Sequence, residues 1–438
     1  MSSKSIDRRA PIQGAVVIHP DREGRSRSRD PEARLEEAVG LSEALDLEVR
    51  DGIIAPLRRL TPATLFGKGK VEEIGRLVVA VSADVAVVDD ALTPVQQRNL
   101  ERAWDCKVID RTGLILEIFA RRARTREGRL QVELARLSYE RSRLVRTWTH
   151  LERQRGGFGV MGGPGETQIE TDRRLIAERI AKLKRELVEV RRTRTLQRSA
   201  RRRVPFPSVA LVGYTNAGKS TLFNRLTEAE VVAEDMLFAT LDPTLRTLKL
   251  PDGRPAILSD TVGFISDLPH ELVEAFRATL EEVREADVIL HVRDIASEES
   301  AAQAQDVREV LARLEIDTDE RRILEVWNKL DLLDEEARRT AGGDARRAHP
   351  PAILVSAVTG EGCEALLRAV SGLVDEAPPV EVVAPAGEGA AIAWLYRNGR
   401  VIERDTADDG AVRLQVSLTA QALGQFEQLF PATQVRAR

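Results

Sequence analysis

A phosphate-loop pattern, G-x-x-x-x-G-K-[ST], constrains the fold of this 438-residue chain more than any other feature of its sequence. The pattern runs from Gly213 to Ser220, follows an apolar segment that ends at Val212, and opens a segment with helical spacing. In that order of strand, loop and helix, backbone N–H groups and the helix N-terminus can surround phosphate groups. The pattern therefore predicts a nucleotide site at the carboxyl edge of a parallel α/β sheet, and a plain glycine turn is the alternative.

Each residue of this loop has an expected part in binding a nucleotide. Lys219 would neutralise the β- and γ-phosphate oxygens and assist catalysis, and the Ser220 hydroxyl would bind Mg²⁺. Asn216 lies in a Gly-x-x-Asn-x-Gly-Lys-Ser loop that resembles those of potassium-stimulated GTPases, so it would either help to hold K⁺ or brace the loop by local hydrogen bonds. The loop residues expected to contact the nucleotide are Gly213, Tyr214, Thr215, Asn216, Ala217, Gly218, Lys219, Ser220 and Thr221.

The motif Asn328-Lys329-Leu330-Asp331 indicates that the base is guanine rather than adenine. The Asp331 carboxylate can accept two hydrogen bonds, from guanine N1–H and the exocyclic amine, whereas adenine offers no such pair of donors. Ser356-Ala357-Val358 follows another apolar segment and is expected to complete the base site. Taken alone, the first motif also fits an ordinary loop at a strand end, so its weight comes from the phosphate loop upstream.

Asp260-Thr261-Val262-Gly263 ends a further strand-like segment and is expected to respond to the γ-phosphate. Asp260 would lie near Mg²⁺, and the Gly263 N–H would reach the γ-phosphate and take part in catalysis. The next residue, Phe264, stands where many small GTPases place a glutamine that orients the attacking water. A phenyl ring has no donor or acceptor for that task, so we expect slow intrinsic turnover and, in addition, a role for Phe264 as a core anchor.

A second segment expected to sense the γ-phosphate is Phe238-Ala239-Thr240-Leu241-Asp242, which lies between the phosphate loop and Asp260. Thr240 is expected to bind Mg²⁺ and to assist catalysis, and Thr244 is the competing choice because spacing alone does not separate the two. The alternative is a polar loop before the hairpin expected at 247–258.

The motifs together predict the α/β fold class, with a P-loop GTPase domain over residues 204–378, because four of them follow strand-like segments and converge on one sheet edge. An N-terminal α/β domain is expected over residues 1–112, a basic helical linker over 113–203, and a small C-terminal α/β domain over 379–438. The elements expected outside the GTPase domain are strands at 14–18, 85–88, 108–109, 391–396 and 412–418, and helices at 31–47, 71–79, 94–104 and 420–430.

The linker concentrates positive charge: residues 111–203 hold 25 Lys and Arg against 11 Asp and Glu, a net +14, although the whole chain carries −4. Two amphipathic stretches, beginning near Leu130 and Leu175, predict helices that pack antiparallel. The Arg side chains would contact RNA phosphates, or else form only a solvated basic face. Between the helices, the glycine-rich stretch from Gly156 to Gln168 is expected to be neither helix nor strand, and to approach RNA or act as a flexible linker.

The sequence does not predict a membrane or secreted protein. No apolar run approaches the ~20 residues that a membrane span needs, and the chain begins without a secretory signal. Its two cysteines suggest no disulfide framework. We therefore expect a cytoplasmic protein that is a monomer when free, with peripheral association with a membrane left open.

The combined motifs resemble the HflX family of ribosome-associated GTPases over nearly the whole chain. The segments that carry the resemblance are Gly67-Lys68-Gly69-Lys70, Asp110-Arg111-Thr112, Gly162 to Arg174, Phe238 to Thr244, Asp260 to Ile265 and Leu268-Pro269-His270. The resemblance implies GTP hydrolysis to GDP, and an N-terminal domain and linker that reach ribosomal RNA of the large subunit near the peptidyl transferase centre. It also implies GTP-dependent splitting or recycling of stalled ribosomes. The alternatives are a ribosome assembly GTPase, an RNA-binding regulator that uses GTP only as a ligand, and a P-loop kinase.

Overall fold

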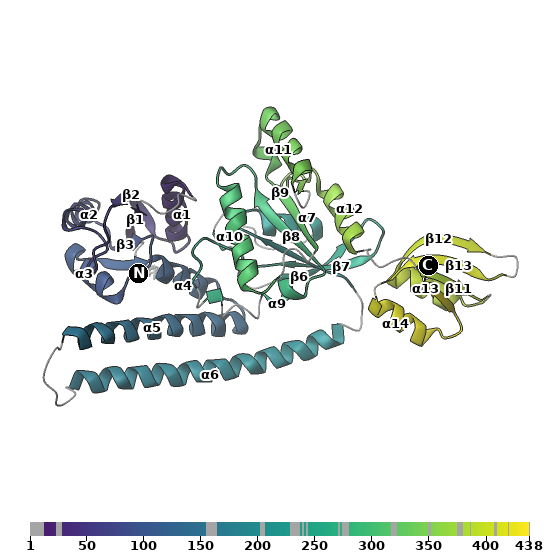
Figure 1. Cartoon of the computed structure of the whole chain (residues 1–438), viewed down its shortest axis with the longest axis horizontal. Coiled ribbons are helices and arrows are strands. Elements are labelled where there is room, and N and C mark those ends of the chain that lie inside the picture. The colour runs from purple at the N-terminus through teal and green to yellow at the C-terminus, as the bar shows by residue number, and fades with distance from the viewer. Residues whose placement is uncertain are drawn as a thin grey trace, which may run out of the picture. The chain divides into compact units, whose positions relative to one another are not determined.

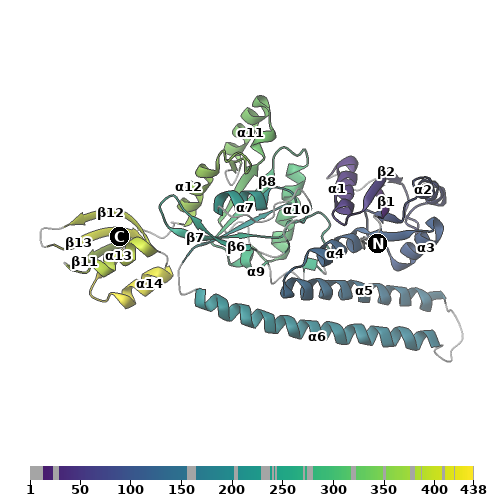
Figure 2. The same cartoon turned by 180° about the vertical axis from the view of Figure 1, so that it is seen from behind.

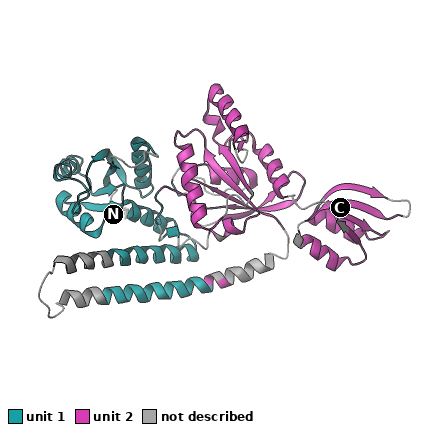
Figure 3. Ribbon diagram, viewed as in Figure 1, with its two compact units in different colours: residues 1–189, 236–238, 267–276 teal, residues 190–235, 239–266, 277–438 magenta. Residues whose placement is uncertain are grey.

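The chain forms two compact units (Figure 3). The first unit comprises residues 1–189, 236–238 and 267–276, and the second comprises 190–235, 239–266 and 277–438. The computed structural model describes residues 13–22, 29–154, 164–201, 206–227, 237–238, 241, 244–269, 272–273, 280–316, 322–348, 352–374, 380–385, 387–406, 410–418 and 420–437.

The N-terminal domain is a four-stranded parallel sheet flanked by helices (Figure 1). Its strands, in the sheet order β2-β1-β3-β4, are β1 (Gly14–Arg22), β2 (Glu48–Leu57), β3 (Val85–Val88) and β4 (Lys107–Asp110). Its helices are α1 (Pro31–Glu43), α2 (Lys68–Ala80), α3 (Pro94–Trp104) and α4 (Arg111–Arg122). The apolar strands β1 and β3 lie in the middle of the sheet, where burial on both faces favours such runs.

Most of the elements expected in this domain are confirmed, and the differences have local causes. The expected strands lie within β1, β3 and β4, and α3 spans its expected residues because Pro94 and a capping box between Thr93 and Gln96 define its start. The helix expected to reach residue 47 ends at Glu43. β2 was not expected, because a glycine and a proline interrupt its strand pattern. α4 begins at Arg111 and so spans the boundary predicted at residue 112.

Two long helices, α5 (Arg126–Gln154) and α6 (Pro164–Arg201), make up most of the basic linker. Both views show them side by side and antiparallel (Figures 1 and 2), and the Arg179 guanidinium of α6 meets the Glu133 carboxylate of α5 at 2.6 Å. The antiparallel prediction is therefore confirmed. The expectation that residues 156–168 are non-helical is wrong from Pro164 onward, because proline suits the first turn of a helix. Residues 156–163 lie outside the described residues.

A six-stranded sheet forms the centre of the domain expected at 204–378. Its strands, in the sheet order β10-β9-β8-β5-β7-β6, are β5 (Ser208–Gly213), β6 (Thr244–Lys249), β7 (Pro255–Asp260), β8 (Val288–Asp294), β9 (Arg322–Asn328) and β10 (Ala352–Leu354). All neighbours are parallel except β6 and β7, which form the expected hairpin. The helices are α7 (Lys219–Thr227), α9 (Glu281–Glu285), α10 (Ser300–Arg313), α11 (Glu335–Arg347) and α12 (Cys363–Val374).

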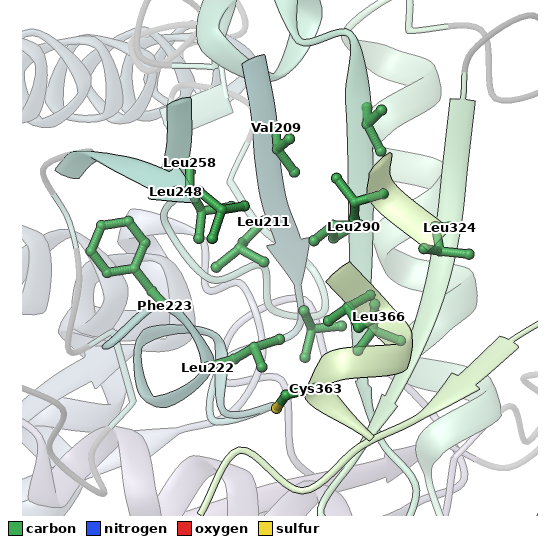
Figure 4. Packing of buried hydrophobic residues seen from close by; sticks show 14 of the residues in the cluster. Val209, Leu211, Leu222, Phe223, Leu248, Leu258, Leu290, Leu324, Cys363 and Leu366 are labelled. Atoms are coloured by element: carbon green, nitrogen blue, oxygen red, sulfur yellow. The ribbon is translucent and has the colours of Figure 1, made fainter. Parts of the chain in front are cut away.

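The core of this domain fixes the position of the phosphate loop. Leu211 of β5, Leu222 of α7, Leu290 of β8 and Leu366 of α12 are buried in one hydrophobic cluster (Figure 4). Burial of each such side chain contributes roughly 1.5–3 kcal/mol relative to exposure. Because β5 lies between β7 and β8, its carboxyl end and the loop that follows are held from both sides.

The C-terminal domain is an antiparallel sheet with two helices. Its strands, in the sheet order β12-β13-β11-β14, are β11 (Val380–Ala384), β12 (Arg400–Thr406), β13 (Val412–Ser417) and β14 (Gln434–Ala437), and its helices are α13 (Gly389–Asn398) and α14 (Ala420–Leu429). The α/β class predicted for this domain is confirmed, as are the strand at 412–418 and the helix at 420–430. The strand predicted at 391–396 is wrong: this segment is helical, and the four-residue spacing of Ala391 and Leu395 buries both against the sheet.

None of the helices in the described part of the chain combines the length and the apolar character that a membrane crossing requires.

Candidate nucleotide-binding site

The phosphate loop joins the end of β5 to the start of α7, in the predicted order of strand, loop and helix. Gly218 has a left-handed backbone with φ +85°, and a Cβ at this position would lie 2.2 Å from Asn328 Nδ2. Only glycine allows this conformation together with so close an approach of the Asn328 side chain. Backbone N–H groups at the start of α7 then face the carboxyl edge of the sheet, where an anion is stabilised.

Lys219 lies under the loop and is almost completely buried. Its Nζ donates hydrogen bonds to the carbonyl oxygens of Gly213 at 3.1 Å and Tyr214 at 2.7 Å. Burial lowers the pKa of Lys219 to about 8, although the Asp260 carboxylate acts in the opposite direction. The Thr215 hydroxyl nearby is buried with no hydrogen-bond partner among the described residues. A phosphate group at this position would stabilise the ammonium form of Lys219.

Two oxygen ligands suited to Mg²⁺, the Ser220 hydroxyl and the Asp260 carboxylate, lie together beyond the carboxyl ends of β5 and β7. The Ser220 hydroxyl donates to Asp260 Oδ2 at 2.7 Å, and Asp260 is completely buried. Hydroxyl and carboxylate oxygens are the hard ligands that Mg²⁺ takes, usually together with water and phosphate oxygens, so this pair fits the expected ion. The neighbouring Thr261 hydroxyl donates to Leu211 O at 2.6 Å and thereby ties β7 to β5.

Gly263 and Phe264 pass directly beside the phosphate loop. A Cβ on Gly263 would lie 2.9 Å from Thr215 Cγ2 and 3.1 Å from Lys219 Nζ, so the Gly263 backbone is close to the expected phosphate position. Phe264 N donates to Gly213 O at 3.1 Å, and Phe264 O accepts from Thr215 N at 2.7 Å. The Phe264 ring is fully buried, which confirms its expected role as a core anchor.

The buried side chain of Asn328 joins the base motif to two other loops. Its Nδ2 donates to Ala217 O at 2.9 Å, and its Oδ1 accepts from Ala357 N at 3.0 Å. Ser356 Oγ donates to Asp331 Oδ1 at 2.5 Å, which orients a carboxylate that is itself only partly buried. Four of the predicted motifs therefore meet at the carboxyl ends of β5, β7, β9 and β10, as expected for one nucleotide site.

Two residues that sequence reasoning missed, Asp294 and Arg225, support the base end of this site. Lys329 has a left-handed backbone with φ 67°, and its Nζ lies 2.7 Å from Asp294 Oδ2 at the end of β8. Arg225 of α7 donates to the carbonyl oxygens of Ala357, at 3.1 Å, and of Val358. Asp294 could have been found from the sequence, because it is an acidic residue at the end of a strand-like segment. Nothing in the local pattern distinguishes Arg225.

The remaining predicted residues are placed as follows. Val262, Leu330, Phe238 and Leu241 are buried, Thr221 is partly buried in the first turn of α7, and Asn216 and Val358 are exposed. Ala239, Thr240 and Asp242 lie outside the described residues, so the catalytic and metal-binding roles of Thr240 stay predictions.

Four family models match consecutive parts of the chain. Their descriptions are "GTP-binding GTPase N-terminal" for residues 32–120, "GTP-binding GTPase Middle Region" for 122–201, "50S ribosome-binding GTPase" for 208–329 and "HflX C-terminal domain" for 345–435. The matches follow the order of the domains predicted from the sequence.

The chain is also similar to named proteins over most of its length. A protein of Magnetococcus marinus named GTPase HflX is 54% identical over 397 residues, which cover 90% of each chain. A protein of the same name from Escherichia coli strain K12 is 46% identical over 385 residues, covering 88% of this chain and 89% of that protein. A crystal structure of a GTP-binding protein from Sulfolobus solfataricus in complex with GDP aligns with 24% identity and a TM-score of 0.42, covering 83% of this chain and 98% of that one.

Replacement of Asp331 by Asn is expected to weaken guanine nucleotide binding about 10- to 100-fold, because an amide accepts only one of the two base hydrogen bonds and places a donor against the other. Affinity for xanthosine nucleotides should rise. Asp334→Asn is a matched control, because Asp334 only caps α11 through Ala337 N and Asn caps helices equally well. Calorimetric titration with both nucleotides gives the affinities, and equal GTP affinity of Asp331→Asn and the wild type would contradict the base assignment.

The affinity for GDP should fall about tenfold between pH 7 and pH 9, because the nucleotide prefers the ammonium form of Lys219, whose pKa in the free protein is about 8. Lys219→Arg serves as the control, since a guanidinium keeps its charge throughout this range and should make the affinity, although lower, independent of pH. Titration in buffers of different ionisation enthalpy should show proton uptake near pH 8 in the wild type alone. A pH-independent wild-type affinity would rule out the titration of Lys219.

Proposed function

The chain belongs to the HflX family of GTPases, and from this membership we propose that it binds the large ribosomal subunit and uses GTP to split or recycle stalled ribosomes. The observation that carries the nucleotide half of the proposal is the meeting of Lys219, the Ser220–Asp260 pair and Asp331 at one sheet edge. Support for the ribosomal half comes from the "50S ribosome-binding GTPase" description of the matching family and from the basic helical linker.

The residues of the site have distinct parts in hydrolysis under this proposal. Lys219 and the N–H groups at the start of α7 bind the phosphates, and the Gly263 N–H, which lies beside them, holds the γ-phosphate in line. Ser220 and Thr240 would hold Mg²⁺, with the Asp260 carboxylate close to it, and the ion would supply neutralisation of the phosphate charge. Asn216 is exposed and has a left-handed backbone at φ 60°. We propose that it assists a K⁺ ion, and the alternative is that it only braces the loop by local hydrogen bonds.

Because Phe264 stands in place of the usual glutamine, another group must orient the attacking water. Its ring is buried and apolar, so it neither orients nor deprotonates the attacking water. Positioning and electrostatics account for nearly all the acceleration in phosphoryl transfer. We propose that an ordered switch segment around Thr240, a cation held by Asn216 or contacts with the large ribosomal subunit complete the catalytic site, and that turnover of the free protein is slow.

Some of the positive charge of the linker has no ion pair within the described part of the chain. On α6, Arg179 is paired with Glu133, and Lys182 lies 4.0 Å from Glu186. By contrast, Lys184, Arg185 and Arg192 are exposed and make no ion pair with other residues of the described part of the chain. Such cations release counterions when they contact RNA phosphates, which makes binding favourable and dependent on salt.

Turnover of GTP measured with and without purified large subunits tests the proposed function. We expect at least ~10-fold stimulation, equivalent to about 1.4 kcal/mol of barrier, and none from small subunits. Fast turnover that large subunits fail to raise would contradict the ribosomal role. If large subunits stimulate but intact ribosomes are left undivided, a role in ribosome assembly replaces recycling.

Neutralisation of three exposed cations, by Lys184→Gln, Arg185→Gln and Arg192→Gln, is expected to weaken large-subunit binding. The slope of log affinity against log salt should become less negative by up to ~2–3. The control removes the same charge from α11, with Arg339, Arg346 and Arg347 changed to Gln. GTP affinity should stay constant in both variants. If the α6 variant keeps the wild-type affinity and salt dependence, as the α11 control should, then Lys184, Arg185 and Arg192 form only a solvated basic face and do not contact RNA.

A further inference from the structure

The base loop, residues 356–360 after β10, uses its backbone N–H groups in a regular way. Of the five N–H groups from Ser356 to Gly360, the first donates to Glu361 O at 2.9 Å and the second to Asn328 Oδ1 at 3.0 Å. The fourth donates to Ser356 Oγ at 3.0 Å and the fifth to Ser356 O at 2.8 Å. The third, Val358 N–H, has no hydrogen-bond partner among the described residues, and Val358 is 65% exposed.

The carbonyl groups of the base loop are oriented by α7. Arg225, in the last turn of this helix, donates from Nε to Ala357 O at 3.1 Å and from Nη2 to Val358 O. Both donors belong to one rigid, planar guanidinium, so a single side chain fixes the direction of two successive carbonyl groups. A Cβ on Gly360 would lie 3.9 Å from Arg225 Nη1, so the end of the base loop also passes close to this side chain.

The direction of the Ala357 carbonyl determines where Val358 N–H points. In a trans peptide, the C=O of one residue and the N–H of the next lie in one plane and point in opposite directions. Because Ala357 O faces Arg225 on α7, Val358 N–H points away from α7. Arg225 therefore orients the one N–H group of the base loop that has no partner in the described part of the chain.

This N–H group lies in the loop whose first residue contacts the predicted base ligand. Ser356 Oγ donates to Asp331 Oδ1 at 2.5 Å, and Val358 follows two residues later. Asp331 is expected to accept hydrogen bonds from guanine N1–H and the exocyclic amine, and the 6-oxo group is the neighbouring acceptor on the same edge of the base. A donor to that oxygen must come from close to Asp331, and Val358 N–H is the unpartnered donor that the base loop offers there.

The helix that carries Arg225 is itself fixed in the core of the domain. α7 begins at Lys219 of the phosphate loop, and its Leu222 and Phe223 side chains are fully buried (Figure 4). The base loop is thus attached to the helix that follows the phosphate loop through Arg225, in addition to its attachment through Asn328. A side chain on so rigid an element is suited to orient a backbone group precisely.

We propose that Arg225 is a positioning residue for base recognition: by holding the carbonyl groups of Ala357 and Val358, it directs Val358 N–H to the 6-oxo group of guanine. Arg225 itself does not contact the nucleotide, and its effect on specificity passes through the backbone of the base loop. The proposal rests on the part of the proposed function that assigns guanine to this site, and it is independent of the ribosomal role.

Three nucleotides separate the contacts of the base in the full-length protein. 6-Thio-GDP keeps N1–H and the exocyclic amine of GDP but replaces the 6-oxo oxygen by sulfur, which is a weak hydrogen-bond acceptor. IDP keeps the 6-oxo group but lacks the exocyclic amine. Calorimetric titration gives two ratios of affinities: GDP over 6-thio-GDP, which measures the 6-oxo contact, and GDP over IDP, which measures the contact of the amine with Asp331.

Arg225→Gln is expected to reduce the preference for GDP over 6-thio-GDP by at least about threefold, as expected for one misaligned hydrogen bond between neutral groups. The preference for GDP over IDP should stay unchanged, because Asp331 is held by Ser356 rather than by Arg225. Arg225→Lys should show the same loss, since it keeps the charge on α7 but offers an ammonium in place of the guanidinium fork.

Arg338→Gln is the matched control. Arg338 Nη1 lies 3.3 Å from Glu361 Oε2, just beyond the base loop, and Arg338 Nε donates to Leu333 O at 3.2 Å. This variant removes the same charge beside the base loop but leaves the carbonyl groups bound by Arg225 in place, so neither ratio should change. Thermal unfolding verifies that every variant is folded.

The proposal would be overturned by an unchanged preference for GDP over 6-thio-GDP in Arg225→Gln, by an equal loss of both preferences, or by an equal effect of Arg338→Gln. Wild-type preference in Arg225→Lys would also overturn it, because charge rather than orientation would then be responsible. Failure of the guanine assignment is distinguishable, because the wild type itself would bind IDP as tightly as GDP.

Hydrogen exchange of a peptide that covers residues 356–360 tests the donor directly. Saturating GDP should slow the exchange of the wild-type peptide, because Val358 N–H gains a partner, whereas saturating 6-thio-GDP should slow it less. In Arg225→Gln the difference between the two nucleotides should disappear. Equal protection of the wild-type peptide by GDP and 6-thio-GDP would contradict the assignment of Val358 N–H to the 6-oxo group, even if the affinity ratio changes.

Discussion

Two hydrogen bonds of the buried Asn328 amide hold the nucleotide site together. One reaches Ala217 O in the phosphate loop and the other reaches Ala357 N in the loop after β10, so a single side chain sets the spacing between the phosphate and base ends of the site. The contact requires a glycine at 218, since any Cβ there would collide with the amide. An unpaired buried amide group costs about 1–3 kcal/mol, so loss of either partner would destabilise both loops. Asp331, for which we predict guanine binding, depends on this arrangement, because it lies in the same turn.

The parts of the site that could be predicted from the sequence are short motifs in which the reactive residues and the residues that set the local backbone are neighbours in the chain. Gly218 and Lys219 must follow a strand and open a helix, so their place in the fold was predictable, as was the position of Asp260 at the end of β7. α13 was mistaken for a strand because its apolar residues form a short run that fits both periods, and tertiary packing of Ala391 and Leu395 decides in favour of the helix. β2 escaped prediction because its glycine and proline are typical of turns.

Long-range charge contacts are the part that sequence reasoning could not supply. Lys329 pairs with Asp294, and Arg34 pairs with Asp267 across more than two hundred positions of the chain. No periodicity links such residues, because their proximity is produced by strand order and helix packing. The same holds for Arg225, whose contacts with Ala357 and Val358 connect α7 to the base loop. Charged residues near strand ends are thus visible in a sequence, but their partners become known only from the fold.

The proposed function depends on a guanine nucleotide site and on a basic helical linker that binds the ribosome. Its central claim is that the bound nucleotide, GTP or GDP, controls the association of ribosomal subunits. Light scattering of intact ribosomes, recorded after addition of the protein with GTP or with GDP, measures this control most directly. We expect scattering to fall with GTP, as subunits separate, and to stay constant with GDP. Constant scattering with GTP, while the same sample hydrolyses the nucleotide, would contradict the splitting of ribosomes by this protein.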